Sequence, residues 1–137
     1  MVKILVHLLT KKINSDFLLQ TAKKSKNAAN CGMFLIHNGV VRCTSKKSVR
    51  KSTKSIKKIS KLDVSFDKNK VNDAIIKTLQ KKGIYYCDVY INKGKLNVGD
   101  NIMYIVIGGD IRQRVVKALE SLVEIIKSSC IKEIEIE

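Results

Sequence analysis

Long apolar runs are missing from this sequence. None approaches the ~18 residues that a helix needs to cross a membrane. The start, MVKILVHLLTKK, is apolar, but only Lys3 precedes its apolar stretch as a basic residue, and no small-residue cleavage site follows. We therefore interpret this start as a strand and not as a signal peptide, and we expect a cytoplasmic protein.

The sequence also lacks Cys and His residues at the spacing of a metal-binding site. The 4 cysteines are Cys31, Cys43, Cys87 and Cys130, with no C-x-x-C pair among them. Only His7 and His37 could add further ligands of the zinc-binding kind. Because a structural zinc site needs four well-spaced ligands, no metal site is predicted. In a reducing cytosol the cysteines are expected to be free thiols buried in strands.

Acidic residues are scarce, with 12 Asp plus Glu against 27 Lys plus Arg and a formal charge of +15. Such an excess attracts polyanions, phosphorylated ligands or an acidic protein partner, and it says little about the fold. The chain has no proline and contains many Lys, Ile and Asn residues, so part of the charge reflects compositional bias. The charge alone leaves the class of partner open.

The length of 137 residues, 45% of them hydrophobic, suits one hydrophobic core and predicts a single domain over 1–137. Apolar periodicity predicts strands at 2–9, 31–44, 59–66, 84–92, 101–109 and 131–137, and helices at 14–28, 67–83 and 110–127. This order, β-α-β-β-α-β-β-α-β, predicts an α+β fold with a largely antiparallel sheet. The last strand, IKEIEIE, should carry one acidic face.

Local signals refine these elements. Asn14 or Ser15 is the expected N-cap of the first helix. Gly39 should mark a bulge or bend in its strand, and Gly83 should be the C′ residue of the second helix. Residues 93–100, KGKLNVGD, are expected to form a turn region.

The third helix has an arginine at its front and a lysine at its end. Asp110 is its expected N-cap, with Gln113 completing a capping box. The preceding Gly108-Gly109 pair either forms a tight turn or lets the backbone approach an anion at the helix N-terminus. Arg112 and Lys127 are either two ordinary solvated charges or parts of one site.

The spacing of Arg112 and Lys127 sets a condition on any shared site. At 100° per residue they lie within about 60° of each other around the helix axis, yet about 22 Å apart along it. One small ligand cannot touch both in a single chain. If they share a site, a second copy must bring its helix start near the helix end of the first, which predicts a two-fold dimer.

The segment 45–61, SKKSVRKSTKSIKKISK, contains eight basic residues interleaved with serines and no acid. It predicts either a mobile loop or a solvated basic arm. One alternative function is therefore a nucleic-acid-binding module that uses this segment, with steeply salt-dependent affinity. The segment has no aromatic residue for base stacking, and no RNA-binding signature is present, which argues against that alternative.

Two stretches resemble one family. CGMFLIHNGVVR (31–42) resembles the glycine-containing strand ending in Gly-x-Val-Arg in the catalytic (large) subunit of molybdopterin synthase. GKLNVGDNIMYIVIGGDIRQRVVKALESLVEIIK (94–127) is similar to that family's Gly-x-Leu-x-x-Gly-Asp/Glu turn, its next strand, and a helix running from an arginine to a lysine. The resemblance covers most of the chain and implies the family's α+β fold, of the α/β hammerhead type.

The resemblance implies an enzyme of molybdenum cofactor biosynthesis, a sulfurtransferase. Such enzymes insert two sulfurs into cyclic pyranopterin monophosphate to form the dithiolene of molybdopterin. The sulfur arrives as a thiocarboxylate on the C-terminal Gly-Gly of a small ubiquitin-like subunit. Two large subunits form a homodimer within a heterotetramer, and each pocket draws residues from both of them. No cofactor and no metal are implied.

The resemblance also implies site residues. Arg42 matches the arginine that holds the anionic pterin, and Arg112 matches one that reaches the substrate phosphate from the neighbouring subunit. Lys127 matches the family's essential lysine, which can stabilise the thiocarboxylate and donate a proton. Lys132 matches a second lysine if a gap of two residues is allowed. His37 stands at an aromatic position of the family and could supply acid–base or anion-binding capacity.

Several positions depart from the family pattern. Ile91 and Asn92 replace a His-Arg pair, and Ile111 replaces the histidine before the late arginine. The Pro-Phe-Trp segment between the two lysines is reduced to SSCI. These departures put turnover in doubt, so a non-catalytic homologue that still docks the sulfur carrier is a further alternative.

Overall fold

The computed structural model describes residues 6–10, 12–51 and 57–137. The helices are α1 (Ser15–Lys23), η1 (Ala28–Asn30), α2 (Lys46–Lys51), α3 (Lys68–Leu79), α4 (Arg112–Ile125) and η2 (Ile126–Cys130). The strands are β1 (Val6–Leu8), β2 (Met33–Val40), β3 (Lys61–Phe66), β4 (Ile84–Ile91), β5 (Gly94–Asn97), β6 (Asn101–Gly109) and β7 (Ile131–Ile136). The first four residues of the predicted strand 2–9, and part of the basic segment at 52–56, lie outside the described residues.

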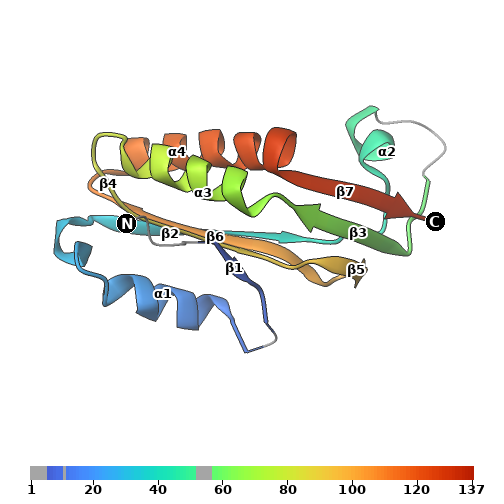
Figure 1. Ribbon diagram of the computed structural model, residues 1–137, viewed down its shortest axis with the longest axis horizontal. Helices are drawn as coiled ribbons and strands as arrows, with labels where there is room; N and C mark the ends of the chain where they lie inside the picture. Colours follow the sequence, from blue (N-terminus) through green and yellow to red (C-terminus); the bar gives the residue numbers. More distant parts are fainter. Residues whose placement is uncertain (1–5, 11, 52–56) are drawn as a thin grey trace.

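The strands form two sheets, where the sequence predicted one. A four-stranded sheet has the order β1-β4-β6-β2, and a three-stranded sheet has the order β5-β3-β7. The β1–β4 pair is parallel and the other pairs are antiparallel, so the predicted α+β class with largely antiparallel pairing is confirmed. Figure 1 shows α3 and α4 side by side over one face of the four-stranded sheet and α1 against the other.

The predicted second helix is confirmed as α3. Asp67 is its N-cap, and Oδ1 of its side chain accepts hydrogen bonds from the N–H groups of Asn69 and Lys70 at 3.0 and 3.2 Å. Val71 and Ile75 on one face of the helix are fully buried in the main core. Burying side chains of this size stabilises the fold by about 1.5–3 kcal/mol each, so this face holds the helix on the sheet.

A second, smaller core lies beneath α1. Asn14 is the N-cap, one of the two predicted residues, and its Oδ1 accepts a hydrogen bond from Phe17 N–H at 2.9 Å. Leu18 and Ala22 are buried against Tyr90, Tyr104 and Val106 of the four-stranded sheet. The sheet is therefore covered on both faces.

The predicted start of α4 is wrong. The helix begins at Arg112, and Ile111 occupies the cap position without a side-chain hydrogen bond. The Asp110 carboxylate instead accepts a hydrogen bond from Ile111 N–H at 2.7 Å and pairs with Arg114 at 2.5 Å. Arg114 lies four residues after Asp110 on the same side of the helix start. The Asp110 carboxylate pairs with its guanidinium and forms no hydrogen bond with the N–H of Gln113.

Of three other local predictions, two are wrong and one is confirmed. Gly83 has a left-handed φ of +81°, but the C-cap of α3 is Gln80, so Gly83 lies in the following turn. The predicted turn 93–100 contains β5, which pairs with β3. The predicted bulge is confirmed by a register shift between Gly39 and Val40.

The four cysteines are free thiols, as predicted. Their expected burial in strands holds for Cys87 of β4, whereas Cys130 is buried in η2 and Cys31 is only half-buried before β2. Cys43 is exposed, because β2 ends at Val40 and the chain has left the sheet by residue 43.

A cationic cleft as the candidate functional site

A small cleft of about 50 Å³ opens where β2, the segment of α2, η2 and β7 converge. Its charged lining consists of Arg42, Lys46, Lys127, Glu133 and Glu135. Three cations against two carboxylates leave a net charge of +1 on these side chains. The floor is apolar, built by Ile59, Leu62 and Ile102. The cleft therefore suits a partly apolar ligand that carries an anionic group.

Arg42 enters the cleft from the end of β2. The bulge at Gly39 and Val40 breaks the register there, so the chain leaves the sheet just before the arginine. Its Nε donates a hydrogen bond to the carbonyl of Thr44 at 3.2 Å. The side chain is otherwise exposed, and a guanidinium of this kind can bind phosphate or carboxylate in a bidentate manner.

Lys127 lies just after the point where the helix changes from α to π. After Ile125 the α-helical pattern gives way to the π-helical turn η2, a feature often found at functional sites. Ile126 and Cys130 of this turn are buried, whereas Lys127 between them is exposed. The buried neighbours hold the turn on the core and leave the lysine at the cleft wall.

His37 lies beside the cleft, on the same face of β2 as Met33 and Leu35, which pack on the main core. Its Nε2 is buried and has no hydrogen-bond partner among the described residues. Burial lowers the pKa of the imidazole, and the positive charge of Lys127 lowers it further. Both effects favour the neutral ring next to the lysine.

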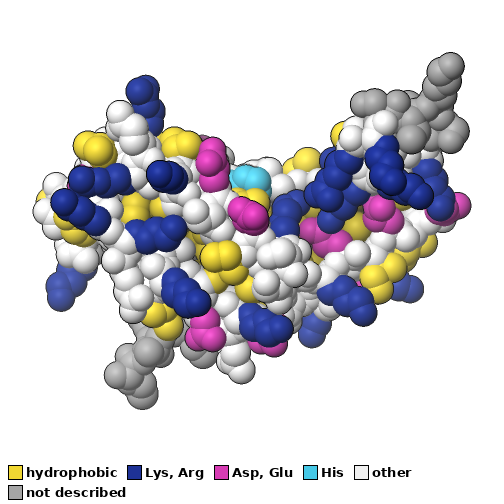
Figure 2. All heavy atoms as spheres, turned by 90° about the horizontal axis from the view of Figure 1, so that it is seen from above, with side chains coloured by type: hydrophobic (Ala, Val, Ile, Leu, Met, Phe, Trp, Pro, Cys, Tyr) yellow, Lys and Arg dark blue, Asp and Glu magenta, His cyan; other side chains and the backbone are white. Residues whose placement is uncertain are grey.

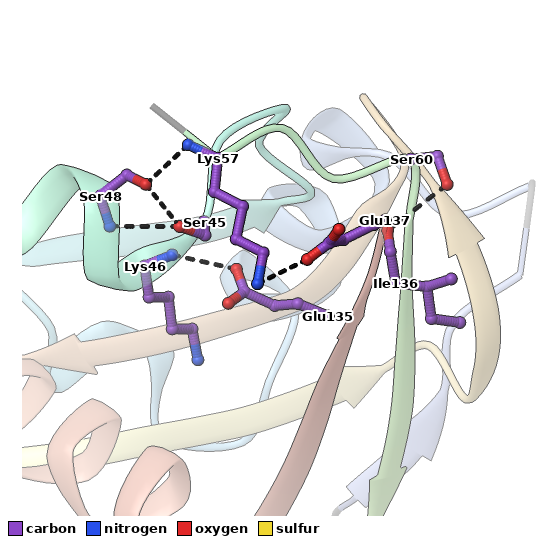
Figure 3. Close-up of polar contacts among 8 residues, drawn as sticks. All are labelled: Ser45, Lys46, Ser48, Lys57, Ser60, Glu135, Ile136 and Glu137. Carbon is purple, nitrogen blue, oxygen red and sulfur yellow. Dashed lines mark hydrogen bonds and ion pairs between the residues drawn. The ribbon is translucent and has the colours of Figure 1, made fainter. Parts of the chain in front are cut away.

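The sequence predicts a mobile loop or a solvated basic arm at 45–61; where this segment is described it contains α2 and forms hydrogen bonds with β7. Ser45 precedes α2, and its Oγ accepts a hydrogen bond from Ser48 N–H at 3.1 Å. The Lys46 N–H donates to Glu135 Oε2 at 3.0 Å, as Figure 3 shows. Lys57 N–H donates to Ser48 Oγ at 2.9 Å. These contacts explain why a short helix forms here without apolar periodicity.

Ion pairs join the same two segments. Lys46 Nζ lies 2.6 Å from Glu133 Oε2, and Lys57 Nζ lies 2.5 Å from Glu137 Oε1. The acidic face predicted for the last strand is therefore the surface on which the basic segment docks. Figure 2 shows Lys and Arg side chains gathered beside the α2 segment, with acidic side chains among them.

The structure does not bring all predicted site residues together. Arg42 and Lys127 line the cleft, and His37 lies next to it. Lys132 is offset by one residue from Glu133 in β7, so it faces the other side of the strand and lines a separate hollow. Arg112 is exposed at the far end of α4 from Lys127. Sequence reasoning missed Lys46, Glu133 and Glu135 as lining residues.

Two negative findings apply to the described part of the chain. Within residues 6–10, 12–51 and 57–137, no group of three or more His, Cys, Asp or Glu side chains could hold a metal ion. No helix in these ranges is long and apolar enough to span a membrane.

Comparison with known proteins identifies the family. The family model described as MoaE protein matches residues 12–129, which is most of the chain. The chain belongs to the MoaE family. This family comprises the large subunits of molybdopterin synthase, so the resemblance seen in residues 31–42 and 94–127 is confirmed. No curated protein matches the sequence.

Solved structures share the MoaE fold at low identity. Molybdopterin synthase from Staphylococcus aureus is 18% identical, covers 99% of this chain and 92% of its own, and has a TM-score of 0.70. The complex of subunits 1 and 2 of molybdopterin-converting factor from Helicobacter pylori is 16% identical, with 96% and 84% coverage and a TM-score of 0.68. The cofactor biosynthesis protein E from Burkholderia multivorans is 11% identical, with 98% and 92% coverage and a TM-score of 0.71.

Proposed function

We propose that this chain is the catalytic subunit of a molybdopterin synthase. It would transfer sulfur from a thiocarboxylated ubiquitin-like carrier to cyclic pyranopterin monophosphate. The observation that carries the proposal is the meeting of Arg42 and Lys127 at one cleft, although they lie in parts of the chain far apart in sequence. Membership of the MoaE family supplies the reaction class.

The two residues have different roles in this proposal. Arg42 binds the anionic pterin, because its guanidinium stays charged and can bond two oxygens at once. Lys127 stabilises the thiocarboxylate anion and donates a proton as sulfur adds to the pterin. His37, which is neutral before the reaction, would serve as a proton acceptor or relay and not as a permanently charged anion-binding group.

A second copy of the chain completes the site. Arg112 lies about one helix length from Lys127, so it can contact the same ligand only from a neighbouring subunit. We therefore infer a homodimer, with a small carrier subunit bound to each copy. The Helicobacter pylori structure, a complex of subunits 1 and 2, is a precedent for such a carrier complex in a related fold. Lys132 in its separate hollow and a cytoplasmic location remain predictions.

The test is reconstitution. The purified chain is mixed with thiocarboxylated carrier and cyclic pyranopterin monophosphate, and dithiolene product is measured. The proposal predicts product that depends on all three components. A dimeric, folded chain that binds the carrier but forms no product would contradict it.

That last outcome would support a second candidate, a carrier-binding homologue without turnover. The observation favouring this candidate is Ile111, which is 48% exposed beside Arg112 where the family has a histidine. An apolar side chain there cannot exchange protons with a ligand. Reconstitution therefore decides between the two candidates.

A further inference from the structure

The cleft contains a second lysine that the family motifs do not point to. Lys46 and Lys127 both line the cleft, one from the α2 segment and the other from η2. Lys132, the lysine expected from the resemblance, faces the other side of β7. The second ammonium group of this cleft is therefore that of Lys46.

Two glutamates of β7 hold Lys46 in position. Its backbone N–H donates to Glu135 Oε2 at 3.0 Å, and its Nζ lies 2.6 Å from Glu133 Oε2. The Glu133 side chain is only 4% exposed, whereas the Lys46 side chain is 35% exposed. A buried carboxylate thus holds a partly open ammonium at the cleft wall, which is a stronger constraint than a pair in full solvent.

Among the described residues, the Lys46–Glu133 ion pair uses only one of the two carboxylate oxygens. Oε1 of Glu133 is buried and has no hydrogen-bond partner among the described residues. Buried carboxylate oxygens nearly always have a donor, so Oε1 can accept a second N–H of the Lys46 ammonium and thereby keep that ammonium at the cleft wall. An ammonium has three N–H donors, and Glu133 is the one carboxylate paired with Lys46 Nζ within the described residues, which leaves donors for an anion.

We propose that Lys46 is a further ligand-binding residue of this cleft and that Glu133 is its positioning residue. Lys46 binds an anionic group between itself and Lys127. Within the proposed function, on which this inference rests, that group is either the phosphate of the pterin or the thiocarboxylate at the carrier's C-terminus. The basic segment then contributes Lys46 directly to the site.

The experiment measures equilibrium binding, so it does not depend on turnover. Calorimetric titrations use two ligands: cyclic pyranopterin monophosphate, added to the chain in complex with unactivated carrier, and thiocarboxylated carrier, added to the chain alone. The variants are Lys46→Met, Lys46→Arg and Glu133→Gln. Lys47→Met is the matched control, because Lys47 is exposed in the same helix and does not line the cleft.

The proposal predicts that Lys46→Met raises Kd about tenfold or more for one of the two ligands, which identifies the source of the anion; tenfold corresponds to about 1.4 kcal/mol. Lys46→Arg should retain most of the affinity, and Lys47→Met should bind like the wild type. Glu133→Gln should weaken binding of the same ligand, and combined with Lys46→Met it should add nothing further, because both changes remove one interaction.

Two results would overturn the inference. One is wild-type affinity of Lys46→Met for both ligands, in a variant whose thermal unfolding matches that of Lys47→Met. The proposed function would then still stand on reconstitution with the wild-type chain. The other is a wild-type chain that binds neither ligand, which would remove the proposed function and this inference together.

Discussion

Burial lowers the pKa of the His37 imidazole in β2, and the positive charge of Lys127 in η2 lowers it further. The two side chains therefore interact electrostatically beside the cleft. The ring nitrogen Nε2 is buried without a partner among the described residues. A neutral, poorly solvated histidine next to a lysine is a costly arrangement for stability. It is also a chemically useful one if a proton must move at this place.

The first prediction concerns stability and pH at His37. The unfolded chain protonates this histidine near pH 6.5, and the folded chain does so only at lower pH. The unfolded state therefore binds more protons in that window, and the free energy of unfolding should fall as the pH falls below 6.5. His37→Phe should remove this loss, and should stabilise the fold by about 1 kcal/mol at pH 7 by removing an unpaired buried nitrogen.

Denaturant unfolding at several pH values checks this prediction. His37→Gln is the matched control, because it removes the titration but keeps a polar group. It should flatten the pH dependence without the gain in stability. If the free energy of unfolding of His37→Phe falls below pH 6.5 as steeply as that of the wild type, other groups cause the loss of stability.

The second prediction concerns Lys127. Lys127→Ala should lower the rate of dithiolene formation by about 100-fold or more, the usual effect of losing a positioned acid–base group. Because Lys127 is exposed, thermal unfolding should change little. Lys117→Ala is the control, since Lys117 is an exposed lysine in α4 away from the cleft lining. Activity equal to that of Lys117→Ala would remove Lys127 from the mechanism.

The same variant gives a readout without turnover. Removal of the Lys127 charge should raise the pKa of His37, as followed by NMR titration of the ring protons. The rise should be partial, because burial is the larger cause of the lowered value. A His37 pKa that does not move would show that the lysine charge does not act on the ring.

The third prediction concerns the glycine pair before α4. A Cβ on Gly109 would lie 2.6 Å from the carbonyl oxygen of Gly83 and 2.7 Å from Val115. Because the first of these atoms is backbone, Gly109→Ala should destabilise the fold by about 1–3 kcal/mol. Gly39→Ala is the control, since its Cβ would meet its nearest atom at 3.5 Å. Equal stability of the two variants would contradict the close approach.

The sequence predicted well those elements whose signals are local. Asn14 caps α1 as one of the two predicted residues, α3 lies within the predicted range 67–83, and β6 follows a continuous apolar run at the predicted bounds 101–109. Capping and periodicity act within a few residues, so they are visible in the sequence. Asp110 was misassigned because its carboxylate had two possible partners, and the cation of Arg114 prevailed over the backbone.

The missed elements depend on contacts between distant parts of the chain. The α2 helix is held by Glu135, 89 residues from Lys46 in sequence. Strand β5 has only four residues and exists through its pairing with β3. In the site, Arg42 and Lys127 were found through family motifs, but Lys46 and Glu133 carry no motif. Their common signal was the complementarity of a basic segment and an acidic strand.

The central claim is that one site uses Lys127 of one copy and Arg112 of another. The most direct measurement is complementation, in which differently tagged Arg112→Ala and Lys127→Ala chains are co-expressed and assayed with carrier and pterin. Random pairing makes half of the dimers mixed, and each mixed dimer has one intact site, so the mixture should recover about a quarter of wild-type activity. Isolated mixed dimers no more active than either variant alone would contradict the account.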